Sequence, residues 1–291
     1  MGRDHSSVLG QDQEAAIGVV GGGTMGASIA SQSLLSGLRT TVIEARPDAA
    51  SRAREHIIAT LGRARSRGFT DISAEVVDQN LAVVVDYERL EGASVVIESV
   101  PEIVELKRDV LQRIRLVVGD EVPIGSNTSA IAIGSLQQGV AGAENIGGLH
   151  FFNPVPASSL IEIVVGPSTN EATVAVFRAL AERLDKEAII VKDAPGFATS
   201  RLGVALGLEA IRMFEDGVAS AADIDQAMVL GYKHPVGPLR LTDLVGLDVR
   251  LAIARYLEQT LGDRFAPPEL LISMVEAGHL GKKSGQGFFG W

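Results

Sequence analysis

The chain has 291 residues, 46% of them hydrophobic and 21% charged, which is typical of a globular protein with one large domain or two ordinary ones. The net charge of −10 disfavours partners such as nucleic acid and anionic membranes, and no apolar run is long enough to cross a bilayer. Because there is no cysteine, disulfides, thiolate catalysis and Cys-based metal sites are excluded. We expect no metal, and a location in the reducing cytoplasm.

Residues 1–13 lack the apolar core of a signal peptide, and we interpret them as a loose extension. From Ala15 onward, short apolar runs alternate with helical patterns. Strands are predicted at 15–21, 39–45, 81–87, 93–100, 121–127, 144–152, 159–166 and 187–193, and helices at 25–38, 47–68, 104–118 and 171–184. This alternation predicts an α/β fold over residues 14–195, with a parallel, doubly wound Rossmann-type sheet.

The strand signals stop after Pro195, and residues 196–291 are predicted to form an all-helical second domain. The evidence is apolar residues at helical spacing from Leu202 to Phe214, a capping box formed by Ser220 and Asp223, a helical stretch over 239–261, and another helix over 269–278 after two prolines.

The segment Gly21-Gly22-Gly23-Thr24-Met25-Gly26 fits the pattern G-x-G-x-x-G between a predicted strand and a predicted helix. Gly21 permits a tight turn, Gly23 lets a pyrophosphate approach the backbone, and Gly26 lets helix and strand pack closely. Glu44 ends the second strand, where a carboxylate accepts hydrogen bonds from ribose hydroxyls and repels a 2′-phosphate. The pattern therefore favours NAD over NADP, although the nearby Arg46 could cover a 2′-phosphate.

A candidate general base follows from His150, at the end of an apolar strand, and Glu162, between two isoleucines. A buried carboxylate needs a partner, and the short connection between the two strands would bring Glu162 to His150. Such a pair suits alcohol oxidation, in which the hydroxyl proton must leave. From spacing alone, a structural core pair is an equally good interpretation.

Two further segments have both a functional and a structural interpretation. The polar run 125–129 follows a strand at the ligand-binding edge of the sheet, so Ser129 could contact the substrate oxygen, or the run could simply cap a helix. Five arginines lie between 52 and 67 and suggest a phosphate site, although charge alone favours a solvated helix face.

Taken together, the motifs resemble the L-3-hydroxyacyl-CoA dehydrogenase family from about Ala15 to Trp291. The matching segments are GGGTMG at 21–26, IESVPEIVELK at 97–107, SNTSA at 126–130, GLHFFNPVP at 148–156, IEIV at 161–164, KDAPGF at 192–197, HPVGPLRLTDLVGLD at 234–248 and GKKSGQGFF at 281–289.

The resemblance implies roles for individual residues. His150 is the catalytic base, Glu162 the acid that orients it and Ser129 the serine that contacts the substrate. The cofactor-binding residues are Gly21, Gly23, Thr24, Met25, Gly26, Glu44, Glu102, Lys107, Asn127 and Asn153. Thr60 and Arg67 meet the phosphates of CoA, which favours the phosphate interpretation of the arginine-rich helix. The family's helical domain forms a homodimer and closes the substrate cleft.

One position departs from the family. Ser200 stands where the family has an asparagine that reaches toward the substrate, and a serine is shorter and offers a single donor. Our first hypothesis is the NAD-dependent dehydrogenation of a short 3-hydroxyacyl-CoA such as 3-hydroxybutyryl-CoA, in fatty acid metabolism. The alternatives are the same chemistry on an acyl carrier protein, and a catalytically idle NAD-binding protein. The joint presence of His150, Glu162 and Ser129 argues against the idle protein.

Overall fold

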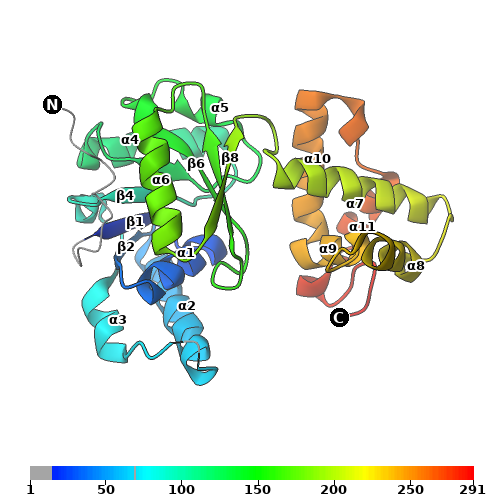
Figure 1. Cartoon of the computed structure of the whole chain (residues 1–291), viewed down its shortest axis with the longest axis horizontal. Helices are drawn as coiled ribbons and strands as arrows, with labels where there is room; N and C mark the ends of the chain where they lie inside the picture. The colour runs from blue at the N-terminus through cyan, green and yellow to red at the C-terminus, as the bar shows by residue number, and fades with distance from the viewer. Residues whose placement is uncertain (1–14, 69) are drawn as a thin grey trace. The chain divides into compact units, whose positions relative to one another are not determined.

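The computed structural model (Figure 1) describes residues 15–68 and 70–291, so the extension predicted over residues 1–13 lies outside the described residues. The first part of the chain contains an eight-stranded sheet, and the second part is helical. In the described part of the chain, no helix combines the length and the apolar character needed to cross a membrane.

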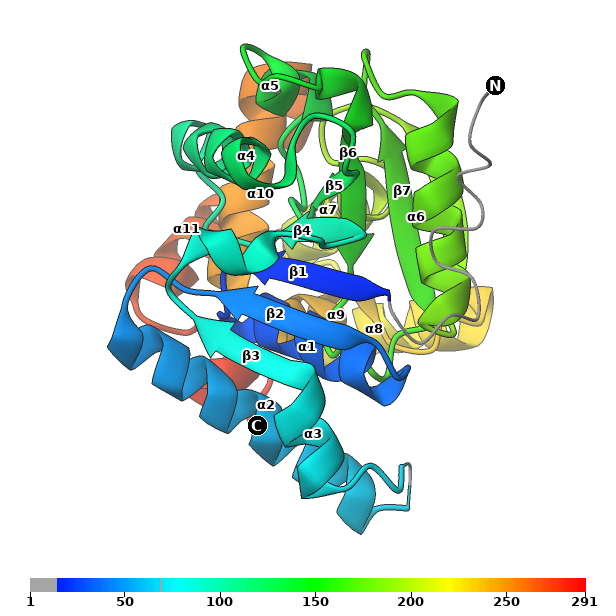
Figure 2. The same cartoon turned by 90° about the vertical axis from the view of Figure 1, so that its left-hand side faces the viewer.

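The sheet has the strand order β3-β2-β1-β4-β5-β6-β7-β8 and carries helices on both faces (Figure 2). Its strands are β1 (Ala16–Val20), β2 (Arg39–Ile43), β3 (Leu81–Val84), β4 (Val95–Glu98), β5 (Ile124–Ser126), β6 (Ile146–Phe151), β7 (Leu160–Val165) and β8 (Glu187–Lys192). The helices are α1 (Thr24–Leu35), α2 (Pro47–Ser66), α3 (Ala74–Asn80), α4 (Val104–Val118), α5 (Ile133–Gln137) and α6 (Glu171–Arg183).

The predicted doubly wound sheet is confirmed, but it is not parallel throughout. β6 and β7 pair antiparallel, with His150 opposite Glu162. The segment 152–159 between them is too short for a crossover helix, so the chain can only turn back on itself. The order reverses between β1 and β4, and such a switch point leaves a crevice at the carboxyl ends of the strands, where α/β proteins bind ligands.

Burial follows the apolar patterns of the sequence. Residues of α1, α2 and α6 share one core cluster with residues of β1, β2, β6 and β7. Ile29 in α1, Ile57 in α2 and Phe177 in α6 are completely buried there. The strands are therefore covered by the apolar sides of helices that follow them in the chain.

Arg115, at the end of α4, is a buried cation without a carboxylate partner; instead it donates to four backbone carbonyls. Nη1 donates to the oxygens of Gly119 and Val122, and Nη2 to those of Gly142 and Asn145, at 2.5 to 3.1 Å. Burial lowers the pKa of this guanidinium to about 10, so it stays charged at neutral pH. Arg115 thereby ties α4 to the loop before β5 and to the turn before β6.

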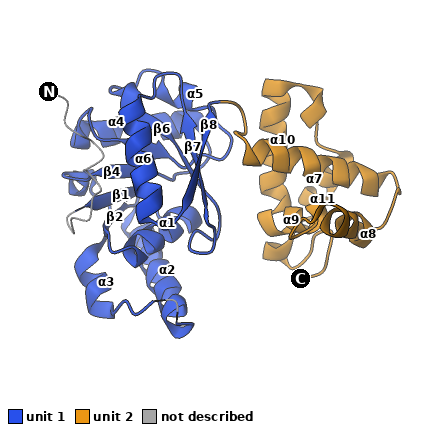
Figure 3. Ribbon diagram, viewed as in Figure 1, with its two compact units in different colours: residues 1–193 blue, residues 194–291 orange. Residues whose placement is uncertain are grey.

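The chain divides into two compact units, Met1–Asp193 and Ala194–Trp291 (Figure 3). The second contains α7 (Thr199–Glu215), α8 (Ala221–Gln226), a π-helical turn (Ala227–Gly231), α9 (Pro238–Val245), α10 (Leu247–Leu261) and α11 (Glu269–Glu276). Its core is made by residues of α7, α9 and α10, among them Leu208, Leu239 and Leu257.

The helix starts and stops of the second unit are mostly those that the sequence predicts. Ser220 caps α8, accepting from the backbone N–H of Asp223 and donating to its carboxylate. The single helical stretch predicted over 239–261 is wrong, because two helices meet at Gly246. Gly246 has a φ of 103°, which ends α9 and which other residues rarely adopt.

We predict that Arg115→Leu lowers the free energy of unfolding by about 3 kcal/mol or more, because four carbonyls lose their donor, among them the buried carbonyl of Asn145. Urea denaturation followed by circular dichroism measures the change. Arg178→Leu, at an exposed position of α6, is the matched control and should cost less than about 0.5 kcal/mol. Equal losses in the two variants would contradict the role given to Arg115.

Candidate active site

The glycine loop joins the end of β1 to the start of α1. Gly21 has a φ of 98°, and a Cβ on Gly26 would collide with the carbonyl oxygen of Gly21, so neither position accepts a side chain. Gly23 is the N-cap residue of α1, and a Cβ placed there would meet nothing within 4 Å. The backbone is therefore open to a ligand at Gly23.

The first turn of α1 adds electrostatic attraction for an anion at this loop. The N–H groups of residues 24–26 have no acceptor within the helix, and the helix dipole places a partial positive charge there. Thr24 is exposed and Met25 is half-buried. The turn can therefore hold a phosphate with backbone donors alone.

Glu44, directly after β2, is held beside the glycine loop. Its Oε1 accepts from the backbone N–H of Gly22 at 2.8 Å, and its Oε2 accepts from that of Ala45 at 3.1 Å. Each carboxylate oxygen can accept a second hydrogen bond. The carboxylate is thus fixed in position and can still receive the hydroxyls of a ribose.

A fully buried ion pair lies at the end of β4. Glu98 and Lys107 have side-chain exposures of 0% and 1%, with Lys107 Nζ 2.8 Å from Glu98 Oε1. Glu98 also accepts from the backbone N–H of Val100 and from the hydroxyl of Ser126, at 2.7 and 2.6 Å. The pair therefore joins the ends of β4 and β5 to α4.

Lys107 has partners for all three of its N–H groups. Besides Glu98, they are the carbonyl oxygen of Val100 at 3.0 Å and Oε2 of Glu102 at 3.4 Å. The ammonium thus holds the loop after β4 in place. The assignment of Lys107 to the cofactor pocket stays a prediction.

Glu102 organises the loop that carries Ser129. Its Oε1 accepts from the hydroxyl of Thr128 at 2.5 Å and from the backbone N–H groups of Ser129 and Ala130 at 2.9 and 3.1 Å. Within residues 15–68 and 70–291, the hydroxyl of Ser129 makes no hydrogen bond, and the residue is half-buried. That hydroxyl can therefore be directed to a substrate.

Of the two asparagines predicted to line the cofactor pocket, one makes structural contacts. Asn127 accepts from the backbone N–H of Phe151 at 2.9 Å and donates to the hydroxyl of Ser99 at 3.2 Å, so it links the ends of β4, β5 and β6. Asn153 is exposed directly after β6. Both positions lie at the carboxyl edge of the sheet.

His150 and Glu162 face each other across β6 and β7. Nδ1 of His150 lies 2.7 Å from Oε2 of Glu162, with side-chain exposures of 5% and 0%. The ring of Phe152 packs against the imidazole at a centroid distance of 4.4 Å. The pair is therefore enclosed, and the carboxylate engages one nitrogen of the ring.

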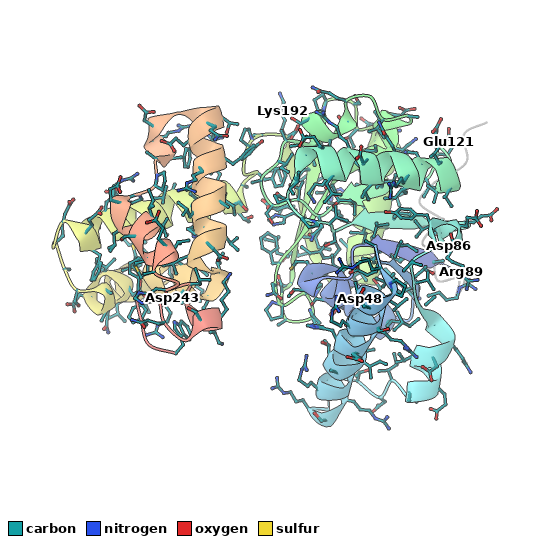
Figure 4. The ribbon with its side chains drawn as sticks, turned by 180° about the vertical axis from the view of Figure 1, so that it is seen from behind. Asp48, Asp86, Arg89, Glu121, Lys192 and Asp243 are labelled. Carbon is teal, nitrogen blue, oxygen red and sulfur yellow. The ribbon has the colours of Figure 1, made fainter. Side chains whose placement is uncertain are left out.

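The arginine-rich helix α2 divides into two parts. At its start, Arg52 pairs with Asp48 at 2.8 Å, which lowers the pKa of Asp48, and Arg54 pairs with Asp78 at 2.6 Å. Figure 4 labels Asp48 at this end of α2. At the other end, Arg63 donates to the hydroxyl of Thr60 at 2.9 Å, while Arg65 and Arg67 are exposed. The positive charge available to an anion therefore lies near the C-terminal end.

Almost the whole chain matches known proteins. Residues 16–194 match the NAD binding domain of 3-hydroxyacyl-CoA dehydrogenase, and residues 196–291 match its C-terminal domain. The chain belongs to the 3-hydroxyacyl-CoA dehydrogenase family. A 3-hydroxybutyryl-CoA dehydrogenase of Mycobacterium tuberculosis is 40% identical over 277 residues, covering 94% of this chain and 97% of that protein.

Solved structures agree with this family assignment. The crystal structure of M. tuberculosis FadB2 has a TM-score of 0.90 and 38% identity, covering 96% of this chain and 100% of that one. The structure of (S)-3-hydroxybutyryl-CoA dehydrogenase PaaH1 from Ralstonia eutropha has a TM-score of 0.89 and 35% identity, covering 96% and 99%. The predicted family and fold class are confirmed.

The cofactor of this family member is NAD, as predicted, and its residues fit the dinucleotide. The open backbone at Gly23 leaves room for the pyrophosphate, the start of α1 supplies donors to it, and Glu44 supplies acceptors for the ribose. These features lie at the switch point of the sheet, where the fold class binds its ligands.

Sequence analysis missed the roles of Glu98 and Asp193. Glu98 ends an apolar strand nine residues before Lys107, and a buried acid in such a strand signals a nearby cation. The Asp193 carboxylate accepts from the backbone N–H groups of Ile133 and Gly134, both at 2.8 Å, and so caps α5. No local pattern points to a cap that comes from so far along the chain.

We predict that Glu44→Ala weakens NAD binding by about 10-fold or more, because the ribose hydroxyls lose charged acceptors worth ~1.5–3 kcal/mol. NADP binding should fall less, since the 2′-phosphate loses a repelling charge. Fluorescence titration with NADH and NADPH measures both affinities. Equal losses for the two cofactors would refute the role of Glu44 in choosing between them.

We also predict that Lys107→Met costs about 3–5 kcal/mol of folding stability, because Glu98 is left buried without a counter-charge. Combining it with Glu98→Gln should recover part of the loss, since the orphaned charge is removed. Urea denaturation of the wild type, Lys107→Met, Glu98→Gln and the double variant gives a double-mutant cycle, from which the coupling energy of the two side chains is obtained. Additive losses would mean that the two side chains are not coupled.

Proposed function

We propose that this protein interconverts a short-chain L-3-hydroxyacyl-CoA and the corresponding 3-oxoacyl-CoA, with His150 as general base and Glu162 as the residue that orients it. The observation that carries the proposal is the buried contact of 2.7 Å between the two side chains at the ligand-binding edge of the sheet. The 3-hydroxybutyryl-CoA dehydrogenases among the relatives support the choice of substrate.

The chemistry assigned to the pair follows from the two nitrogens of the ring. When Nδ1 donates to Glu162, the tautomer places a lone pair on Nε2, which takes the hydroxyl proton of the alcohol. The carboxylate then stabilises the imidazolium without accepting its proton. NAD held by the glycine loop and Glu44 would supply the acceptor for the hydride that leaves the carbon bearing the hydroxyl. In the reverse direction Nε2 returns the proton to the substrate oxygen.

Ser129 is assigned to the same oxygen of the substrate. Its hydroxyl can donate to the 3-oxo group, and this donation strengthens as negative charge develops on that oxygen. Glu102 accepts hydrogen bonds from the backbone N–H groups of Ser129 and Ala130. These bonds support the role of Ser129, because a catalytic donor has to be held in a fixed position.

The remaining assignments concern cofactor and CoA. We assign Asn127, Asn153, Glu102 and Lys107 to the surroundings of NAD, the last two as residues that shape the loops. We assign Thr60 and Arg67 to the phosphates of CoA, which is consistent with the charge near the end of α2.

The helical region 196–291 is assigned to substrate binding and to a homodimer. Large apolar side chains exposed on it support a covering partner, among them Leu202, Leu230 and Tyr232, which are 71%, 59% and 76% exposed. We place the enzyme in the cytoplasm, where NAD and CoA thioesters are available, as a step of fatty acid metabolism.

We predict that the purified protein oxidises NADH in the presence of acetoacetyl-CoA. His150→Gln should lower kcat by ~10²–10⁴, the range for removing a general acid–base group. Glu162→Gln should also lower it, because the amide no longer stabilises the imidazolium. Circular dichroism checks that both variants fold.

An unchanged rate in folded His150→Gln would refute the base, and no turnover by the wild type would refute the dehydrogenase. The same assay with an acyl carrier protein thioester tests the alternative carrier that Ser200 suggested.

A further inference from the structure

Two arginines at the start of α2 share one carboxylate. Nε of Arg46 lies 3.3 Å from Oδ1 of Asp48, and Nη1 of Arg52 lies 2.8 Å from Oδ2. The side chains of all three residues are more than half exposed. Asp48 therefore binds one cation on each of its oxygens, at a surface that a dissolved ligand can reach.

This group of charges lies beside the position assigned to the ribose of the cofactor. Arg46 comes two residues after Glu44 and is the N-cap residue of α2. Because β1 and β2 pair parallel and in register, the glycine loop and the segment of Glu44 and Arg46 leave the sheet at the same edge. Glu44 accepts from the backbone N–H of Gly22, and the described residues include no ion pair between Glu44 and Arg46. The two arginines are thus neutralised by Asp48 and not by the ribose acid.

Cations at this edge favour the other dinucleotide. In dinucleotide-binding folds, an arginine near the end of the second strand accommodates the 2′-phosphate of NADP. A guanidinium pairs with a phosphate through two parallel hydrogen bonds, and the N-terminus of α2 adds a partial positive charge. A site for NAD with Arg46 and Arg52 so close to its ribose acid therefore needs a means of withholding them.

A purely structural role does not account for the whole arrangement of Asp48. An acid in the first turn stabilises a helix through the helix dipole, and a pair four residues apart adds a little more. Neither effect involves Arg46, which precedes the first turn of α2. The contact with Arg46 therefore asks for a second explanation.

We propose that Asp48 is a second determinant of cofactor choice, which holds Arg46 and Arg52 and so keeps both guanidinium groups from a 2′-phosphate. Glu44 repels that phosphate directly, whereas Asp48 acts through the two arginines and is a positioning residue. The inference concerns the cofactor and not the acyl substrate, and it rests on the assignment of Glu44 to the ribose.

The test measures binding and not turnover. Fluorescence titration gives the affinities of the wild type and of Asp48→Asn for NADH and for NADPH. Asparagine keeps the shape of the side chain but lacks the charge that holds the arginines. We expect the ratio of the two affinities to shift toward NADPH by about 3- to 10-fold, because two exposed ion pairs, each weak, are released. The shift should shrink in about 0.5 M salt, which screens exposed charges.

Asp78→Asn is the matched control. Asp78 is 63% exposed and pairs at 2.6 Å with Arg54, which also belongs to α2, and its replacement removes the same single charge. The ratio of affinities should stay as in the wild type. An equal shift in the two variants would mean that net charge alone is responsible and would overturn the proposal, as would an unchanged ratio in Asp48→Asn.

Variants of the arginines test whether they carry the effect. Arg46→Gln and Arg52→Gln together should remove the gain in the Asp48→Asn background, and should change the ratio less when Asp48 is present to hold them. A gain that persists without both arginines would overturn the proposal. A merely structural role of Asp48 would weaken NADH and NADPH alike and leave the ratio unmoved. Reduction of acetoacetyl-CoA, run in parallel, reports on the proposed dehydrogenase, so the two ideas fail separately.

Discussion

The antiparallel pairing of β6 and β7 is the constraint on which the catalytic proposal depends. It places His150 and Glu162 directly opposite each other, so the carboxylate meets Nδ1 at 2.7 Å inside the sheet. Successive side chains of a strand point to opposite faces, and a slip by one residue would send Glu162 to the other face, away from the imidazole. The apolar neighbours Ile161 and Ile163, both buried, make such a slip unfavourable, so packing enforces the register that the chemistry needs.

Buried charges play different parts elsewhere in the molecule. Glu98 and Lys107 neutralise each other. Lys107 also contacts Glu102, which in turn accepts from the backbone N–H of Ser129, so the ion pair helps to fix the position of that loop. In the helical unit, the buried carboxylate of Asp243, labelled in Figure 4, accepts from the backbone N–H groups of Phe288 and Phe289 and so holds the C-terminal segment. In each case the cost of burying a charge is offset by several well-directed hydrogen bonds. These networks position groups as well as stabilise them.

Much of this arrangement follows from sequence patterns, for physical reasons. Apolar runs of strand length give the strands of the sheet, because a central strand is buried on both faces. The glycine loop is recognisable because close backbone contacts exclude side chains at Gly21 and Gly26. The break at Gly246 was missed, since a glycine inside a helical pattern can be either tolerated or terminal. Short helices such as α3 and α5 were missed because they bury few residues, one of them being Val77 of α3.

The function of a buried polar residue is harder to predict than its burial. In the sequence, Lys107 and Arg250 are both cations within amphipathic helices, where a charged residue is usually solvated. The structure separates them by what surrounds them: Lys107 reaches three acceptors supplied by β4 and the loop after it, whereas Arg250 lies over glycines that supply none. Acceptors of this kind come from outside the helix that carries the cation, so the helical pattern does not contain them.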